Sequence, residues 1–245
     1  MRKTSLVDYP ALVSSVFFFA GCNLRCPWCH NRELVMGGAG QAGGFEEAVR
    51  LEKAVGIEEA LAHIEKRRYV LGGVVLSGGE PCLYEDIAPL IAEIKTLGLR
   101  VKLDTNGMFP AVLENLFSRK ETSPDYIALD LKISPARYGN LVRPASSSDF
   151  DANAALIKSA AIIRESGIEH EYRTLALPGG FITTQDIESL TPLVDNKSPW
   201  YFRQFKGGNC LDSSWNNLEE SSAAASALAS TLAEKARELG KTAIV

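Results

Sequence analysis

Strand-like apolar segments alternate with helix-like amphipathic segments along the 245 residues of this chain. The first strand ends in three consecutive Phe residues, as a strand buried on both faces would. Such alternation gives a parallel sheet with helices outside it. Six strand–helix units, rather than the eight of a closed barrel, predict an α/β fold, an incomplete (β/α)6 barrel of parallel strands that is open on one side. The strands are predicted over residues 12–19, 74–77, 100–104, 126–132, 170–177 and 200–206.

The helical segments carry their own start signals. Thr183 and Asp186 form a capping pattern for a helix that reaches residue 194, and Asn217 with Glu220 forms one for the last helix. Because no linker interrupts the alternation, a single domain over residues 1–245 is expected. The other helices are predicted over residues 57–67, 86–97 and 150–166, and from residue 110 onward.

Three cysteines, Cys22, Cys26 and Cys29, lie within eight residues directly after the first predicted strand, in the spacing C-x3-C-x2-C. Three thiolates on one short loop can hold three irons of a [4Fe–4S] cluster and leave the fourth iron open. Because such clusters usually take four cysteine ligands, a set of three predicts an iron that a small molecule can reach.

Zinc and disulfides are the alternatives for these cysteines. A structural zinc ion takes four ligands, and His30 or Cys210 could complete such a set. Zinc ligands usually come in two separated pairs, however, and the sequence has no second C-x2-C or H-x3-H pair. Five cysteines and the lack of an apolar signal segment argue against disulfides. The spacing therefore favours an iron–sulfur cluster over zinc.

The cysteine motif, with an aromatic residue before its last cysteine, resembles the signature of the radical S-adenosylmethionine (radical SAM) enzymes. Two longer strings, SLVDYP at residues 5–10 and AGCNLRCPWCHN at residues 20–31, resemble the glycyl-radical-enzyme activases within that superfamily. Among these, the chain is most similar to anaerobic ribonucleoside-triphosphate reductase activating proteins. The resemblance extends over essentially the whole chain.

This resemblance implies reductive cleavage of S-adenosylmethionine at the cluster to a 5′-deoxyadenosyl radical, which abstracts a hydrogen atom from a glycine of a partner glycyl radical enzyme. It implies flavodoxin or ferredoxin as the electron donor, and a cytoplasmic, anaerobic setting. Two other functions stay open: a radical SAM enzyme that acts on a small molecule or a tRNA base, and a non-enzymatic zinc-binding module.

Further motifs follow the other predicted strands. In parallel α/β sheets, ligands bind outside the carboxyl ends of the strands. We therefore expect one shared pocket there. The motifs at these ends are the cysteine loop, Gly78–Glu80, Asp104–Gly107, Asp130–Lys132 and Pro178–Gly180.

Several of these side chains suit the polar ends of S-adenosylmethionine. Gly78 and Gly79 let the backbone approach its methionine part closely. Glu80 can accept hydrogen bonds from the amino group, and Lys132 offers a cation for the carboxylate. Arg173, on the fifth strand, is expected to help by its charge or to bind the backbone of a partner protein, or else to be a solvated edge residue.

The nucleoside end of the cofactor has three candidate residues. Trp28 and His30 flank the third cysteine and could line the adenine site, Trp28 by stacking. Some activases carry a ribose-binding histidine on the last strand, where this sequence has Gln204 as the candidate substitute.

Two motifs of the resembling activases, Asp-Thr-Asn-Gly at residues 104–107 and Asp-x-Lys at residues 130–132, are complete in this chain. The resemblance implies that Asp104, Thr105 and Asn106, together with Asp130, bind S-adenosylmethionine and a monovalent cation near Asp104 and Asp130. An acidic residue in an apolar strand needs a partner if it is buried. Lys132, two residues after Asp130 on the same strand face, could simply form a structural pair with it.

The overall composition argues against two classes of binding partner, nucleic acids and membranes. A net charge of −4 and a pI near 5.5 do not indicate the basic surface that a nucleic-acid-binding protein needs. No apolar stretch approaches the ~20 residues of a membrane helix.

The glycine-rich segment Gly37–Gly44 is expected to be a mobile surface loop, or a flap that orders when a partner docks. Cys82 and Cys210 are expected to be small buried residues, and neither His63 nor His170 is expected to be catalytic.

Overall fold

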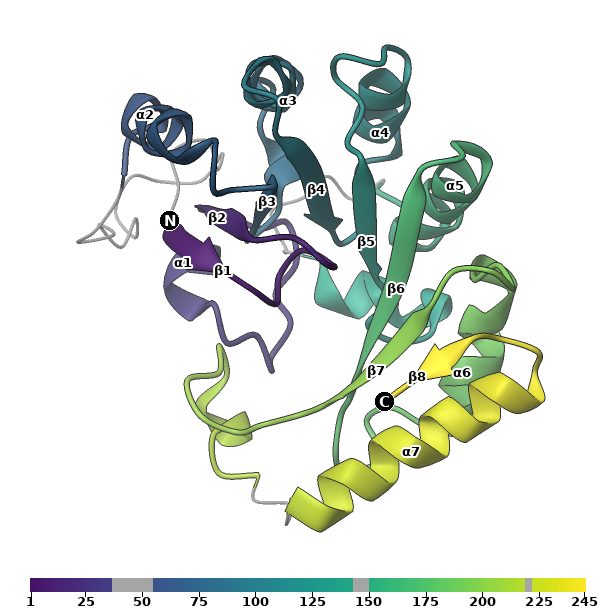
Figure 1. The fold of residues 1–245 in the computed structure, drawn as a ribbon. Helices are drawn as coiled ribbons and strands as arrows, with labels where there is room; N and C mark the ends of the chain where they lie inside the picture. Colours follow the sequence, from purple (N-terminus) through teal and green to yellow (C-terminus); the bar gives the residue numbers. More distant parts are fainter. Residues whose placement is uncertain (37–54, 143–149, 219–221) are drawn as a thin grey trace. The chain divides into compact units, whose positions relative to one another are not determined.

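The computed structural model describes residues 1–36, 55–142, 150–218 and 222–245 (Figure 1). The Gly37–Gly44 segment and Glu220 lie outside the described residues. The chain divides into two compact units. Unit 1 comprises residues 1–23, 33–105 and 111–127, and unit 2 comprises residues 24–32, 106–110 and 128–245.

The strands follow chain order in one sheet, from β1 to β8, so the sheet is not closed. The predicted α/β class with an open sheet of mostly parallel strands is confirmed. The described residues contain eight strands rather than six, because a strand precedes the first predicted one and a short strand follows the last helix. The single domain over residues 1–245 stays a prediction.

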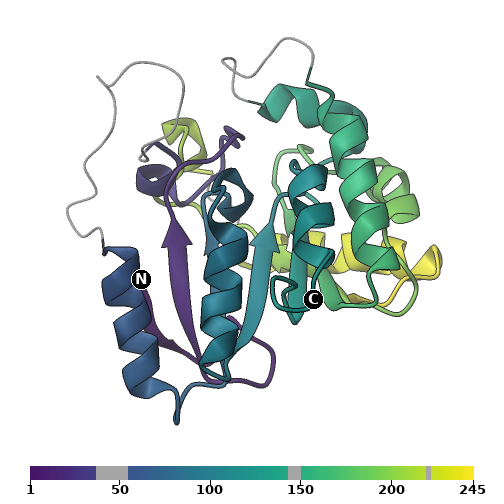
Figure 2. The same ribbon diagram turned by 90° about the horizontal axis from the view of Figure 1, so that it is seen from above.

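Unit 1 is built on three parallel strands. β2 pairs with β3, and β3 with β4, so that Phe19 lies beside Gly78 at the carboxyl end of the sheet. Helices α2 and α3 lie on the same side of these strands (Figures 1 and 2). The elements are β1 (Arg2–Ser5), β2 (Ser14–Phe19), α1 (Arg32–Met36), α2 (Ile57–Arg67), β3 (Gly73–Gly78), η2 (Pro81–Leu83), α3 (Ile87–Thr96), β4 (Arg100–Thr105), α4 (Pro110–Phe117) and the start of β5 (Tyr126–Asp130).

Unit 2 repeats the strand–helix pattern. β6 pairs with β7, and β7 with β8, all in parallel, and α7 packs against β7 and α6 (Figure 1). The elements after β5 are η3 (Pro135–Leu141), α5 (Ala152–Glu165), β6 (Glu169–Ala176), α6 (Thr184–Leu190), η4 (Thr191–Leu193), β7 (Trp200–Gln204), η5 (Ser213–Trp215), α7 (Ser222–Glu238) and β8 (Ala243–Ile244).

Besides shifts of one or two residues at the ends of strands and helices, the structure differs from the sequence prediction at three elements. β1 was not predicted because three of its four residues are exposed and polar, which leaves no apolar alternation; it pairs antiparallel with β2. The Thr183–Asp186 capping box is present, but α6 ends at Leu190. Pro192 has no backbone N–H to continue it, and a 3-10 turn follows. The last helix begins at Ser222 rather than after Asn217.

Candidate functional site

In unit 1, the Gly78–Glu80 turn is tied to the backbone that leads into Cys22. The N–H of Gly79 donates to the carbonyl of Phe19 at 2.8 Å, and that of Glu80 to the carbonyl of Gly21 at 2.9 Å. A Cβ on Gly79 would collide with the carbonyl of Gly21, and Gly78 has a φ of +115° beside Phe19. The two glycines therefore have a packing reason of their own, because the ends of β2 and β3 approach too closely for a side chain.

The Glu80 carboxylate is held in place inside unit 1. Glu80 is 1% exposed, and its Oε1 accepts hydrogen bonds from Thr105 Oγ1 at 2.8 Å and from the Cys82 N–H at 3.1 Å. Burial, followed by the negative charge of Glu80, raises the pKa of the Cys82 thiol. Cys82 is thus a buried, inert thiol, as predicted, and Glu80 has a fixed orientation.

Asp104 in unit 1 lies between two side chains. Its Oδ2 accepts a hydrogen bond from Ser77 Oγ at 3.0 Å, and its Oδ1 lies 3.3 Å from Lys102 Nζ. Lys102 is a buried lysine that the sequence reasoning did not single out, since a lysine in a strand usually faces solvent.

In unit 2, Asp130 at the end of β5 forms two ion pairs. Its Oδ2 lies 3.2 Å from Lys132 Nζ, and its Oδ1 accepts from Arg173 Nε at 2.8 Å. Burial alone would raise the pKa of Asp130, but the two cations outweigh it and lower the pKa to about 2. The predicted pairing of Asp130 with Lys132 is confirmed. The alternative of a solvated edge residue is wrong for Arg173, because its strand pairs with β7 and its side chain pairs with Asp130.

Lys132 interacts electrostatically with two of the cysteines as well as with Asp130. Burial opposes the charge on Lys132, but Asp130, Cys26 and Cys29 contribute negative charge that raises its pKa. Cys26 and Cys29 share one turn, in which the Cys29 N–H donates to the Cys26 carbonyl at 3.0 Å. Unit 2 therefore brings Cys26, Cys29, Asp130, Lys132 and Arg173 to one region, whereas Cys22 belongs to unit 1.

Tyr138 supports this region and was not foreseen. Its fully buried hydroxyl accepts from the Lys132 N–H at 2.6 Å and donates to the Asp130 carbonyl at 3.2 Å. Burial raises the pKa of Tyr138, which keeps it neutral. A single tyrosine eight residues after the end of β5 has no spacing signature, so only the fold could reveal this role.

The predicted adenine-stacking residue has aromatic partners within the chain. Trp28 is 5% exposed and packs against Phe181 and Trp215, with ring centroids 5.0 and 5.4 Å away. His30 stacks on Phe205 at 5.7 Å. Adenine binding by Trp28 and His30 stays a prediction.

The remaining predicted residues lie at strand ends in unit 2. Asn106 is 4% exposed, and its Oδ1 accepts from the Met108 N–H at 3.0 Å. Gln204 is the last residue of β7, opposite Ala176 of β6. Their cofactor contacts stay predictions as well.

The cysteines have the chemistry that an iron–sulfur cluster requires. All five are free thiols, and Cys22 and Cys26 are buried. Soft thiolate ligands select iron–sulfur clusters or zinc. No group of three or more His, Cys, Asp or Glu side chains that could hold a metal ion is found among the described residues. The assignment of a cluster therefore rests on the cysteine spacing and on the resemblance to radical SAM enzymes.

Cys210 is fully buried, and burial, followed by the charge of Cys29, raises its pKa. The Leu211 N–H donates to the Cys29 carbonyl at 2.9 Å, so the loop after β7 covers the cysteine turn. The prediction of a buried residue is confirmed for Cys210.

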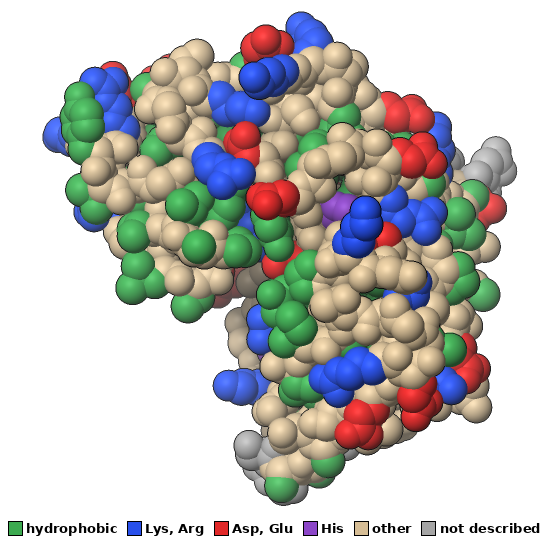
Figure 3. All heavy atoms as spheres, turned by 45° about the vertical axis from the view of Figure 1, so that its right-hand side comes forward, with side chains coloured by type: hydrophobic (Ala, Val, Ile, Leu, Met, Phe, Trp, Pro, Cys, Tyr) green, Lys and Arg blue, Asp and Glu red, His purple; other side chains and the backbone are tan. Residues whose placement is uncertain are grey.

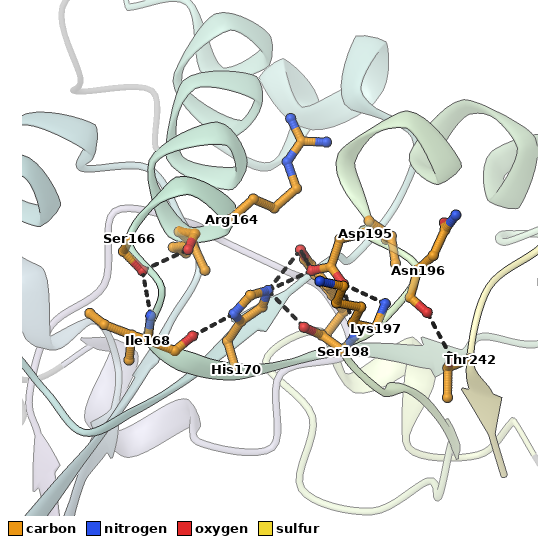
Figure 4. Close-up of polar contacts among 12 residues, drawn as sticks. Arg164, Ser166, Ile168, His170, Asp195, Asn196, Lys197, Ser198 and Thr242 are labelled. Atoms are coloured by element: carbon orange, nitrogen blue, oxygen red, sulfur yellow. Dashed lines mark hydrogen bonds and ion pairs between the residues drawn. The ribbon is translucent and has the colours of Figure 1, made fainter.

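A second polar cluster in unit 2 lies at the opposite ends of the strands (Figure 4). His170, near the start of β6, has its Nε2 2.7 Å from Asp195 Oδ2 and 3.0 Å from Ser198 Oγ. Tyr172 donates to the same Asp195 oxygen at 3.1 Å. Because one ring nitrogen of His170 faces both Asp195 and Ser198, this is not a nucleophile–base–acid relay, which needs both nitrogens. The cluster joins β6 to the loop before β7.

We expect Asp195→Asn to destabilise the protein by about 2 kcal/mol at neutral pH, the usual cost of a lost charge-assisted network. Burial would raise the pKa of Asp195, but backbone N–H groups of Ser198 and Lys197 and the side chain of His170 lower it below its ordinary value. A lowered native pKa stabilises the fold above the unfolded value of about 3.9 and loses that contribution as the pH falls.

Urea unfolding across this pH range measures the effect, with Asp151→Asn as the matched control. Asp151 caps α5 through one backbone N–H, so the control should change stability by less than about 0.5 kcal/mol. A difference between wild type and Asp195→Asn that grows as the pH falls would contradict this account.

The visible molecular face mixes both charge signs. Lys and Arg side chains are interspersed with Asp and Glu side chains in Figure 3. In the part of the chain that the structure describes, no helix is long and apolar enough to cross a membrane.

Comparison with known proteins supports the resemblance. The radical SAM superfamily pattern matches residues 16–190. A protein of Methanocaldococcus jannaschii named for glycyl-radical enzyme activation is 29% identical over 87% of this chain and 82% of its own length. The pyruvate formate-lyase-activating enzyme of Listeria monocytogenes is 30% identical over 76% of this chain and 70% of its own. The 7-carboxy-7-deazaguanine synthase of Hyperthermus butylicus is 39% identical, over 40% of this chain and 36% of its own.

Solved structures share the fold. A radical SAM methyltransferase from Sphaerobacter thermophilus superposes with a TM-score of 0.62 at 15% identity, over 97% of this chain and 67% of its own. Streptococcus suis SuiB bound to S-adenosylmethionine gives a TM-score of 0.57 at 15% identity over 94% of this chain, which spans about half (49%) of SuiB. With the family pattern over most of the chain and activating enzymes among its relatives, this chain belongs to the radical SAM superfamily of enzymes.

Proposed function

We propose that this chain activates a glycyl radical enzyme. The observation that carries the proposal is the C-x3-C-x2-C loop directly after β2, in a chain whose similarity to an activating enzyme extends over 87% of its length. When bound, a [4Fe–4S] cluster and S-adenosylmethionine would supply reductive cleavage to a 5′-deoxyadenosyl radical that takes hydrogen from a glycine of the partner.

The three cysteines Cys22, Cys26 and Cys29 would hold the cluster. Lys132, whose charge Asp130 fixes, would face the cofactor carboxylate, and its electrostatic coupling to Cys26 and Cys29 supports this placement. Such fixed charges orient a ligand before the reaction begins.

The other candidate residues would bind the rest of S-adenosylmethionine. Glu80, held by Thr105 and Cys82, would accept hydrogen bonds from the amino group beside Gly78 and Gly79. Arg173 would act through its pairing with Asp130. Trp28 and His30 would line the adenine site, and Gln204 would line the ribose site. Asn106, in the turn after β4, would also contact the cofactor. The resemblance also implies a monovalent cation near Asp104 and Asp130, although Lys102 already places a positive charge 3.3 Å from Asp104.

The partner is proposed to be an anaerobic ribonucleoside-triphosphate reductase, on the resemblance of residues 5–10 and 20–31. Flavodoxin or ferredoxin would supply the electrons, in an anaerobic cytoplasm. A second candidate function, radical chemistry on a small molecule, is favoured by the similarity to a 7-carboxy-7-deazaguanine synthase over 40% of the chain.

The test uses the full chain, reconstituted with iron and sulfide without oxygen, then mixed with S-adenosylmethionine, dithionite and a candidate glycyl radical enzyme. We expect 5′-deoxyadenosine, and the glycyl radical doublet of the partner in electron paramagnetic resonance. A partner variant with alanine in place of the radical glycine is the control.

The outcomes separate the functions. Formation of 5′-deoxyadenosine with no radical on any glycyl radical enzyme would move the proposal to a small-molecule substrate. Zinc in place of iron, with no 5′-deoxyadenosine, would favour the zinc-binding module.

A further inference from the structure

Lys102 on β4 is a charged side chain that the proposed function does not use. It is 3% exposed, within unit 1. Lysine is almost never fully buried unless it is paired, because its ammonium is strongly hydrated in water. Its position therefore requires acceptors nearby.

Those acceptors come from two places. Lys102 Nζ donates to the carbonyl of Asp8 at 2.9 Å and lies 3.3 Å from Asp104 Oδ1, over the ring of Tyr126 at 5.7 Å. Asp8 belongs to the SLVDYP string at residues 5–10, which thus takes part in holding this charge.

The strand geometry aims the ammonium at the carboxylate. Lys102 and Asp104 are two residues apart on β4, so their side chains leave the same face of the sheet. Val75 lies opposite Lys102 in the register, in an apolar cluster with Tyr9 and Val16. The stem of Lys102 therefore lies on the face that carries this apolar cluster, and its ammonium lies 3.3 Å from one oxygen of Asp104, whose other oxygen accepts a hydrogen bond from Ser77.

We propose that Lys102 is a positioning residue whose ammonium supplies the positive charge at Asp104, in place of the inorganic monovalent cation that the family resemblance implies there. Two like charges on one carboxylate repel each other strongly in a poorly solvated site, so Lys102 leaves little affinity for a cation at that oxygen. The role in cofactor binding rests on the proposed function, whereas the charge at Asp104 does not.

The proposal predicts how the protein responds to monovalent cations. Binding of S-adenosylmethionine to the reconstituted wild type should have the same Kd in choline, sodium or potassium chloride. In Lys102→Met, which keeps the apolar stem and loses the charge, sodium or potassium should restore affinity by about 10-fold over choline, a usual coupling between linked sites. Equilibrium dialysis under anaerobic conditions measures this Kd.

A second readout needs no cofactor. The thermal midpoint of the cluster-free chain should be the same in the three salts for the wild type, and higher in sodium or potassium than in choline for Lys102→Met. It decides the proposal even if neither protein binds S-adenosylmethionine, an outcome that would count against the proposed function alone.

Three variants guard the interpretation. Lys95→Met is the matched control, because Lys95 also donates to backbone carbonyls and lies 3.5 Å from a carboxylate, that of Asp125 on the segment before β5. Lys102→Arg should stay insensitive to the cation, and Lys102→Met with Asp104→Asn should lose the sensitivity. A wild type that needs sodium or potassium would overturn the proposal, and so would a folded Lys102→Met that does not respond to them. If Lys102→Met does not fold, the wild type and Lys102→Arg still decide the point.

Discussion

Replacing Cys26 with alanine is expected to abolish the iron–sulfur cluster and with it the formation of 5′-deoxyadenosine. Three thiolates are the smallest set that holds a cluster with one open iron, so none can be spared. Replacing a residue that only hydrogen-bonds to a metal ligand already lowers metal affinity or activity by about 10–100-fold. The loss of a ligand should therefore exceed about 100-fold. Iron content, visible absorbance and 5′-deoxyadenosine measure it.

Cys210→Ala is the matched control for this prediction. Cys210 is a buried free thiol whose loop covers the Cys29 turn, and it is the cysteine that a four-ligand zinc site could recruit. We expect this variant to keep its iron and its product, with only a small loss of stability from the vacated volume. Loss of metal in both variants would support a four-cysteine site and contradict the open cluster.

Gly79→Ala is expected to destabilise the protein by about 3 kcal/mol or more. The added methyl group would occupy the place of the Gly21 carbonyl, and both are backbone-anchored, so one strand end must move. Overpacking usually costs about 1–3 kcal/mol, and here two backbone hydrogen bonds, from Gly79 to Phe19 and from Glu80 to Gly21, are disturbed as well. The melting temperature should fall by about 6–12 °C for a chain of this size.

Gly139→Ala controls for the general effect of alanine. A Cβ there meets nothing within 4 Å, and its φ is not in the positive range. We expect its stability to stay within about 1 kcal/mol of the wild type, with a gain if the unfolded chain loses entropy. Equal melting temperatures for Gly79→Ala and the wild type would show that the Gly78–Glu80 turn does not depend on close packing.

Much of the fold follows from patterns that are local in sequence. Strands β2 to β7 were predicted from the alternation of strand-like with helix-like segments, and continuous apolar runs mark β2, β3 and β5 as buried strands. The capping box of α6 was predicted from two residues, Thr183 and Asp186. The strand order could be inferred from alternation, since a parallel crossover needs a helix between strands. The motifs at the ends of β3, β4 and β5 were found at those ends.

Elements without such a pattern were missed. β1 is polar and exposed, and it exists because β2 offers it an edge to pair with. The start of α7 was misplaced because a cap-like pair, Asn217 and Glu220, stands before a different helix start at Ser222. Capping residues are frequent in loops as well, so a cap alone does not locate a helix.

Residue types at short, fixed spacings were enough to predict the parallel α/β class, the cysteine loop and the acidic motifs. Which charged side chains pair with each other depends instead on the three-dimensional fold. Arg173 on β6 donates a hydrogen bond to Asp130 on the neighbouring strand β5, and Lys102 donates one to the carbonyl of Asp8, which is 94 residues away in the sequence. The Tyr138 hydroxyl likewise forms hydrogen bonds with the backbone of Asp130 and Lys132 at the end of β5. Such contacts are set by strand register and by burial, because a buried polar group costs free energy unless it pairs with a partner that the fold brings within reach.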